Sequence, residues 1–351
     1  MRLFFFLFLF SIFSQAQISF LINSSSEYND NPFRDSVGNA SYVNSTSFLF
    51  DFSVSKVSLN YMGSYNYYQK FADRNFYWHR LSFSIQDSLN VLSLNYSQRL
   101  NKNDYSLFDY SDFFLNAEKR FSLNMFQLRS SATGKFTIYK NLSEYNNFSF
   151  FANLSGYKFF DSKTTLILGL ELNYKYYLQK TIANNISVNP YVFQGNFKIR
   201  VAQSIFEKTG ISISNEYRKI LSGNGKDIFN IATNYADETD LFDDPFSLNG
   251  NRFGIMITQI LTNNLSLQIN YNYETKNFPA QGIYLEDNTY RTSENKNDES
   301  SIISVSLKKE LYSDNFLLNT EILFEYQNNI SNSFFYNYSS KSLALNFTFL
   351  F

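Results

Sequence analysis

The feature that most constrains the fold is a two-residue alternation of apolar and polar side chains. The segment 164–177 reads TTLILGLELNYKYY, and the segments 191–201, 265–273 and 316–326 repeat its pattern. One parity of the first segment carries Leu166, Leu168, Leu170, Leu172, Tyr174 and Tyr176, and the other carries Ile167, Gly169, Glu171, Asn173 and Lys175. Because successive side chains of a β-strand point to opposite faces, the alternation predicts strands with one apolar and one polar face. None of these segments fits a helical period.

The composition agrees with such two-faced strands. Aromatic residues make up 19% of the chain and charged residues only 17%, yet the mean hydropathy is −0.29. An apolar face beside a polar face accounts for both values. The chain has no cysteine, which excludes disulfides and thiolate-bound metals. A net charge of −1, without any basic run, indicates that nucleic acid is not a partner.

The first residues predict a secretory signal peptide. A positive start at Met1-Arg2 precedes an apolar run over 3–13, and the small-residue site Ser14-Gln15-Ala16 follows. The apolar run is too short for a membrane-spanning helix, which needs about 20 residues. We therefore expect residues 1–16 to be removed after Ala16 and residues 17–351 to form the mature domain. No later apolar stretch approaches the length of a spanning helix.

The connections between the predicted strands alternate between short and long. Short connections are expected at 55–56, 86–90, 119–122, 159–163, 203–209, 262–264 and 310–314, and longer polar ones at 28–42, 69–76, 100–108, 138–146, 178–188, 221–249, 276–299 and 327–337. Tight periplasmic turns and larger outer loops are typical of a transmembrane antiparallel up-and-down β-barrel. The pattern predicts an all-β barrel of roughly 16 strands, within a range of about 14–18.

The chain ends in a strand of special character, SKSLALNFTFLF. Its apolar parity consists of Leu343, Leu345, Phe347, Phe349 and Phe351. This strand resembles the recognition strand of Gram-negative outer-membrane β-barrel proteins, which ends on an aromatic residue. The resemblance implies an integral outer-membrane location, contact with membrane lipid and lipopolysaccharide, and recognition of the terminal strand by the barrel-insertion machinery. A soluble β-sandwich would also alternate, but it would not need so many aromatic residues at its strand ends.

The polar parity predicts the residues that line the barrel interior. The basic candidates are Lys175, Lys198, Arg200, Arg218 and Arg252, and the acidic candidates are Glu171, Glu216, Glu321 and Glu325, with Asp112 and Glu118 on an earlier strand. Separate walls of opposite charge across a narrow lumen would select solutes by sign and dipole. The alternative is local neutralisation, for example if Glu216 lies beside Lys198 on the adjacent strand.

These expectations favour a porin-like channel for passive diffusion of small hydrophilic solutes, because a barrel of about 16 strands encloses an aqueous channel. General trimeric porins have a long third outer loop, whereas the corresponding segment here, NKNDYSLFD, is short. Two alternatives stay open. A non-conducting barrel would serve export of surface lipoprotein or polysaccharide with a periplasmic partner, since Tyr28, Asn29, Asp30, Asn31 and Arg34 loosely resemble the first strand and loop of such barrels. The second alternative is surface binding or adhesion through the loops 221–249 and 276–299.

No residue pattern predicts an enzyme, a metal site or a cofactor. His79 shares the lipid-facing parity with Leu81, so Ser82 and Ser84 point away from it, and a nucleophile needs its base within hydrogen-bond reach. Asp73 and Asp104 lie in successive outer loops and are candidates for a carboxylate pair by location only. The acidic stretch YADETDLFDDPF lacks the glycine and closing glutamate of an EF-hand, so a solvated loop is the expected state.

Overall fold

The structure, a computed structural model, describes residues 17–123, 126–179, 181–183, 186–223, 246–313 and 316–351. The predicted signal peptide and most of the acidic 221–249 loop therefore lie outside the described residues. Within the part of the chain that is described, no helix has the length and apolarity needed to cross a bilayer.

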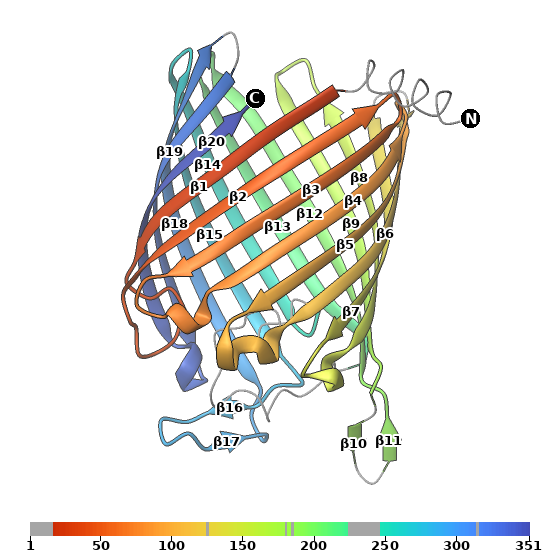
Figure 1. The fold of residues 1–351 in the computed structure, drawn as a ribbon, viewed down its shortest axis with the longest axis vertical. Coiled ribbons are helices and arrows are strands. Elements are labelled where there is room, and N and C mark those ends of the chain that lie inside the picture. The colour runs from red at the N-terminus through yellow and green to blue at the C-terminus, as the bar shows by residue number, and fades with distance from the viewer. Residues whose placement is uncertain (1–16, 124–125, 180, 184–185, 224–245, 314–315) are drawn as a thin grey trace, which may run out of the picture.

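Sixteen strands form the wall of a closed barrel, as predicted (Figure 1). They are β1 (Gln17–Asn29), β2 (Ser41–Val54), β3 (Val57–Tyr68), β4 (Phe76–Gln86), β5 (Asn90–Asn101), β6 (Tyr110–Leu123), β7 (Phe126–Tyr139), β8 (Asn147–Phe159), β9 (Thr164–Tyr177), β12 (Tyr191–Phe206), β13 (Thr209–Gly223), β14 (Asn249–Thr262), β15 (Leu265–Phe278), β18 (Lys296–Ser313), β19 (Phe316–Ser331) and β20 (Tyr338–Leu350). Each strand pairs antiparallel with its neighbour in the chain. The antiparallel β1–β20 pair, in register from Leu21↔Leu350 to Asn29↔Ser342, closes the cylinder.

Small secondary-structure elements lie in the longer loops at one end of the barrel, called the loop end below. They are the ribbons β10 (Thr181–Ala183) with β11 (Ile186–Val188) and β16 (Ile283–Tyr284) with β17 (Tyr290–Arg291), and the 3-10 turns η1 (Ala72–Arg74), η2 (Asn103–Phe108), η3 (Ser143–Tyr145) and η4 (Phe334–Tyr336). The start of β1 and the end of β20 lie at the opposite end, beside the short turns (Figure 1). An even strand number produces this arrangement, as in outer-membrane barrels.

Two predicted turns were placed too early in the chain. The segment 119–122 belongs to β6, because Lys119 to Leu123 continue the ladder with β7 as far as the pair Leu123↔Phe126. Most of 310–314 belongs to β18, which pairs with β19 as far as Ser313↔Phe316. Charged residues at a barrel rim resemble turn residues in sequence, yet their backbone groups still join the ladder.

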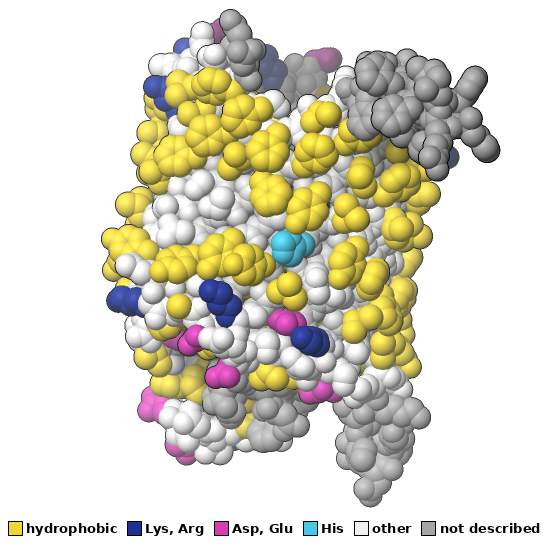
Figure 2. Space-filling model, in the orientation of Figure 1, with side chains coloured by type: hydrophobic (Ala, Val, Ile, Leu, Met, Phe, Trp, Pro, Cys, Tyr) yellow, Lys and Arg dark blue, Asp and Glu magenta, His cyan; other side chains and the backbone are white. Residues whose placement is uncertain are grey.

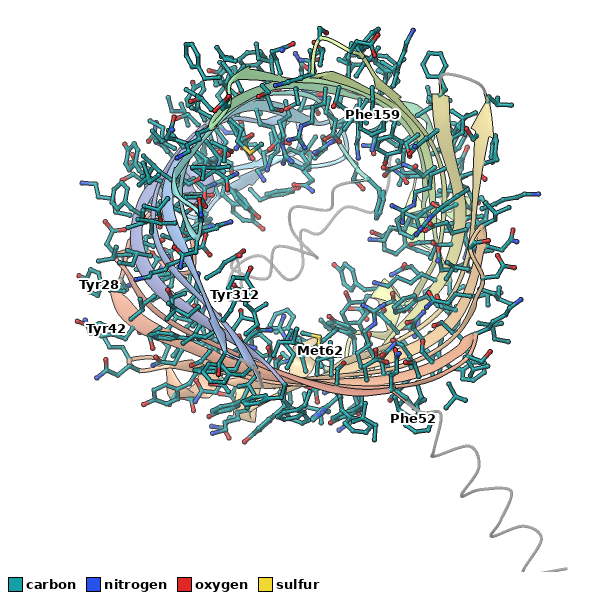
Figure 3. The ribbon with its side chains drawn as sticks, turned by 90° about the horizontal axis from the view of Figure 1, so that it is seen from above. Tyr28, Tyr42, Phe52, Met62, Phe159 and Tyr312 are labelled. Carbon is teal, nitrogen blue, oxygen red and sulfur yellow. The ribbon has the colours of Figure 1, made fainter. Side chains whose placement is uncertain are left out.

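The wall has an apolar exterior and a polar interior. Outward-facing Leu170 and Phe197 are 49% and 48% exposed, whereas Gln194 on the other parity of β12 is fully buried. Viewed along the barrel, Tyr28 and Tyr42 point outward while Met62 and Tyr312 point into the lumen (Figure 3). Hydrophobic side chains spread over the outer wall (Figure 2). Such a surface would promote aggregation in water, but it is the stable arrangement in hydrocarbon, where the closed ladder satisfies the backbone.

The main buried hydrophobic cluster lies at the loop end rather than in the middle of the barrel. We call it the mouth cluster; it consists of Phe108, Tyr139, Leu142, Tyr145, Tyr177 and Tyr284. Its members come from η2, from η3 and the residue before it, from the loop-side ends of β7 and β9, and from the small strand β16. Tyr105, Leu107, Tyr110, Tyr290, Phe335 and Tyr336 pack around it. The cluster therefore joins loops that are far apart around the rim.

Candidate functional site

A line of alternating charges crosses five neighbouring strands on the inner wall. We call it the charged strip; it consists of Glu171, Lys198, Glu216, Arg218, Glu274 and Arg252. Strand register brings the charges together. Lys198 lies opposite Glu216 across β12 and β13, and Glu216 lies opposite Arg252 across β13 and β14. Arg252 in turn lies opposite Glu274 across β14 and β15.

The distances show a continuous chain of ion pairs. Lys198 Nζ lies 2.9 Å from Glu171 and 3.7 Å from Glu216. Arg218 lies 2.8 Å from Glu216 and 3.1 Å from Glu274, and Arg252 completes the chain at 2.9 Å from Glu274. Three carboxylates thus neutralise three cations within the strip. These residues therefore fit local neutralisation better than separate walls of opposite charge. Lys198 and Glu216 are neighbours, as that alternative requires.

Arg200 is the exception among the predicted basic residues. Its Nε donates a hydrogen bond of 2.7 Å to Ser212 Oγ, and no ion pair to a described carboxylate involves it. The side chain lines a cavity of about 630 Å³ on the inner wall, together with Arg129, Tyr157, Lys198 and Glu216. The strip and Arg200 together carry one more cation than anions. Arg200 therefore adds to the cavity lining a guanidinium group that no described carboxylate pairs with.

Arg129, which lines the same cavity, belongs to a second group of charges. Glu118 accepts from Arg129 at 2.5 Å and from Arg120 at 2.7 Å. Asp112, further toward the loop end, pairs with Lys135 at 3.0 Å and accepts from Thr137 at 2.6 Å. The acidic residues of this wall are thus also locally paired.

The remaining predicted residues lie apart from the strip. Glu321 pairs with Lys308 at 3.4 Å, and Glu325 with Arg34 at 3.8 Å, both from β19. Lys175 is nearly buried near the loop end of β9, where its ammonium lies 5.1 Å from the ring centre of Tyr177. Lys198, Arg218 and Arg252 thus pair with Glu171, Glu216 and Glu274 of the strip and not with Glu321 or Glu325.

Two residues of the site were missed in the sequence. Glu274 falls on the polar parity of β15, directly after Ser266, Gln268, Asn270 and Asn272, so extending the alternation by one step would have found it. Arg129 lies on β7, whose alternation is weak because the small residues Ser130, Ala132 and Gly134 stand on its outward-facing parity. Neither partner assignment follows from one strand alone, since it needs the register between strands.

The other candidate residues have plain structural settings. His79 faces outward with Tyr61, whose hydroxyl lies 2.7 Å from His79 Nδ1. Asp73 accepts a hydrogen bond of 2.6 Å from the Asn103 amide, which ties two outer loops together. In the described residues no group of three or more potential ligands is placed to hold a metal ion. The acidic loop lies outside the described residues at Asp237, Glu238, Asp240, Asp243 and Asp244.

The terminal strand closes the barrel. Leu343 and Leu345 are exposed on the outer wall, and Phe347 and Phe349 follow on the same parity of β20. The Phe351 N–H donates to the Phe20 carbonyl at 2.9 Å, and the Phe20 N–H donates back at 3.3 Å. The two rings lie 6.4 Å apart. The last residue is thus part of the seam between the first and last strands.

These features define the class: the protein is a β-barrel of the Gram-negative outer-membrane type, closed by sixteen antiparallel strands. No protein-family model matches the chain, and no curated protein matches its sequence. The fold is similar to OccK1 (OpdK) from Pseudomonas aeruginosa, with a TM-score of 0.54 and 10% identity over 96% of this chain and 99% of that one. It is similar to OccAB1 from Acinetobacter baumannii, with a TM-score of 0.59 and 9% identity over 96% of both chains. OccAB4 from the same organism gives a TM-score of 0.51 and 8% identity over 96% of this chain and 99% of that one.

Proposed function

We propose that the protein is a porin-like channel through which small hydrophilic solutes diffuse passively across the outer membrane. The observation that carries the proposal is the combination of sixteen strands with a polar, charged inner wall. Barrels of 8 strands are filled by their own side chains, whereas about 16 strands leave room for water. A cavity of about 630 Å³ beside the charged strip is consistent with this size class.

The inner wall supplies the selectivity. The charged strip presents alternating charges that are fixed by ion pairs, so it can orient a polar solute without trapping it through a large net charge. Arg200 adds the surplus positive charge at the cavity. Lys198, Arg218 and Arg252 hold the carboxylates in place, and Arg200 is the residue that contacts a passing anion. No chemical step is involved, so the protein acts as a channel and not as an enzyme.

The outer wall and the terminal strand support the membrane part of the proposal. The apolar exterior suits an integral position in the outer membrane, in contact with lipid and lipopolysaccharide. The strand ending at Phe351 serves as the insertion signal for the barrel-assembly machinery, after export through a cleaved signal peptide over 1–16. A structure of OpdK has been determined with vanillate, so a barrel of this fold can hold a small molecule.

Single-channel recording in a planar lipid bilayer tests the proposal, with ion selectivity measured from a salt gradient. Folding is first verified by the shift in gel mobility between unheated and boiled protein. Discrete current steps from folded protein are expected. A folded protein that inserts but passes no current would overturn the channel and favour export with a periplasmic partner, or surface binding.

A further inference from the structure

The loop between β15 and β18 reaches across the outer mouth of the barrel. We call residues 279–295 the arm; it contains the β16–β17 ribbon, which lies beyond the loop end of the barrel wall in Figure 1. Tyr284 of the arm is 4% exposed and belongs to the mouth cluster with Phe108, Tyr139 and Tyr145. In the order of the barrel, β15 and β18 lie nearly half a circuit from β5, β6 and β7. The arm therefore spans the opening to reach the far rim.

The near side of the arm is firmly anchored. The Lys296 N–H donates to the Gln281 carbonyl at 2.9 Å, and the Tyr284 N–H donates to Ser333 Oγ at 3.0 Å. The Lys296 side chain is 1% exposed and lies 3.2 Å from the Asp298 carboxylate. Its ammonium also lies over the rings of Phe278 and Tyr336, at 4.2 and 3.4 Å from their centres. This buried, charged base fixes where the arm leaves the wall.

The arm itself is a compact hairpin. The Gly282 N–H donates to the Tyr290 hydroxyl at 2.7 Å, and a Cβ at Gly282 would lie only 2.1 Å from the Arg291 carbonyl oxygen. Only glycine allows this approach, so the two sides of the hairpin stay in contact. The ring of Tyr284 packs on Tyr290 at 4.8 Å. The hairpin is therefore held together by its own contacts as one compact unit.

The far side of the arm is held by ring packing in the mouth cluster. Tyr139 and Tyr145, at the end of β7 and on η3, form an edge-to-face pair at 6.4 Å in the cluster that receives Tyr284. Each aromatic pair of this kind contributes only about 0.5–1.5 kcal/mol beyond its area burial, so a contact made by rings separates more readily than the charged, hydrogen-bonded base.

We propose that the arm is a displaceable lid over the outer mouth, hinged at its Lys296 base and latched by Tyr284, whose N–H leaves Ser333 and whose ring leaves the mouth cluster when the arm is displaced. The proposal rests on the proposed function in one respect, because the movement regulates passage only if the barrel conducts. The closed position buries Tyr284 and covers the lumen from outside. Displacement of the arm exposes the cluster and opens the route to the charged strip.

Thiol labelling tests the lid without relying on conductance, since the natural chain has no cysteine. The reporter is Ile283→Cys, whose parent side chain is 3% exposed beside the latch. Glu286→Cys, at an exposed position of the same arm, gives the unhindered labelling rate. In folded protein we expect the reporter to react at least tenfold more slowly with a water-soluble maleimide than Glu286→Cys does.

The latch is tested from both of its sides in the reporter background. Tyr284→Ala and, across the mouth, Tyr145→Ala should each raise the reporter rate at least fivefold, while Tyr28→Ala on the outer wall should leave it unchanged. An unchanged rate in the Tyr145→Ala variant, with an intact gel-mobility shift, would overturn the lid, because the arm would then be held from its own side alone. Bilayer recording of the same variants separates the two proposals: faster labelling without current supports the lid and contradicts the channel.

Discussion

Glu216 lies directly opposite Lys198 on one side and Arg252 on the other in the register of the barrel wall. Its carboxylate nevertheless makes its shortest contact with a third cation, Arg218, at 2.8 Å along its own strand. One carboxylate thus pairs with cations from two strands and faces a third cation across the ladder. Because the wall is held by main-chain ladders, these charges are free to serve selectivity, and their mutual neutralisation keeps them in fixed positions.

Replacing the central carboxylate should loosen the charged strip. In Glu216→Gln, Arg218 and Lys198 lose a charged partner that is only 17% exposed, so an unfolding free energy lower by about 1–3 kcal/mol is expected. Urea unfolding followed by tryptophan fluorescence measures the change. Glu286→Gln, in the exposed part of the outer arm, is the control and should be neutral. Equal stability of the two variants would show that the strip does not act as a unit.

Arg200 should set the sign of ion selectivity. Because no described carboxylate neutralises it, Arg200→Glu changes the local charge by two units and should shift the reversal potential in a salt gradient toward cation preference. Arg200→Lys keeps the charge and should retain the selectivity of the natural protein. A reversal potential that is the same for both variants would place the selectivity elsewhere in the lumen.

The base of the arm should depend on a matched pair of buried charges. Lys296→Met leaves Asp298, 3% exposed, without its ammonium partner at 3.2 Å, and removal of one member of a buried pair costs about 3–5 kcal/mol. Limited proteolysis should then cut within 279–295 at lower protease concentration. The double variant Lys296→Met with Asp298→Asn should recover part of the resistance, since neither charge is left alone. Additive losses would show that the two residues act independently.

The terminal aromatic residue should matter for assembly beyond its place on the wall. Phe351→Ala removes the ring that lies 6.4 Å from that of Phe20 and ends the predicted insertion strand. A smaller fraction of the exported protein should then reach the folded form that shifts in gel mobility on heating. Phe316→Ala removes an exposed ring from an internal strand and is the matched control. If the two variants assemble equally well, the end of the chain carries no special signal.

The sequence alone predicts the barrel because a period of two is a local property. A strand such as 164–177 carries Leu or Phe on one parity and polar or charged residues on the other. Its two faces can therefore be assigned from its own sequence, without reference to any neighbouring strand. The alternation of turn lengths then gives the strand number. The errors at 119–122 and 310–314 arose where charged rim residues lie on strands whose ladders extend beyond the apolar belt.

The candidate site was less accessible to sequence reasoning because pairing depends on register. The polar parity puts Lys198, Glu216 and Arg252 on the polar faces of their strands, but the register decides whether these charges repel, align or neutralise each other. A slip of one residue would change every partner. The mouth cluster could not be predicted from the sequence for a related reason. Its tyrosines come from separate loops, and no periodicity connects them.

Asp87 should make the β4–β5 turn sensitive to acid. The N–H groups of Leu89 and Asn90 donate to its carboxylate at 2.8 and 2.7 Å, and these backbone hydrogen bonds hold the pKa of Asp87 below its ordinary value. Because the pKa is lowered in the folded state, the carboxylate contributes stability above the pKa of the unfolded chain, and this contribution is lost as the pH falls through the folded-state value. Asp87→Asn should therefore lower the midpoint of the heat-induced gel shift at pH 7, while the difference from the natural protein narrows toward pH 2–3. A constant difference across that range would mean that the turn is stabilised by shape and not by the charge on Asp87.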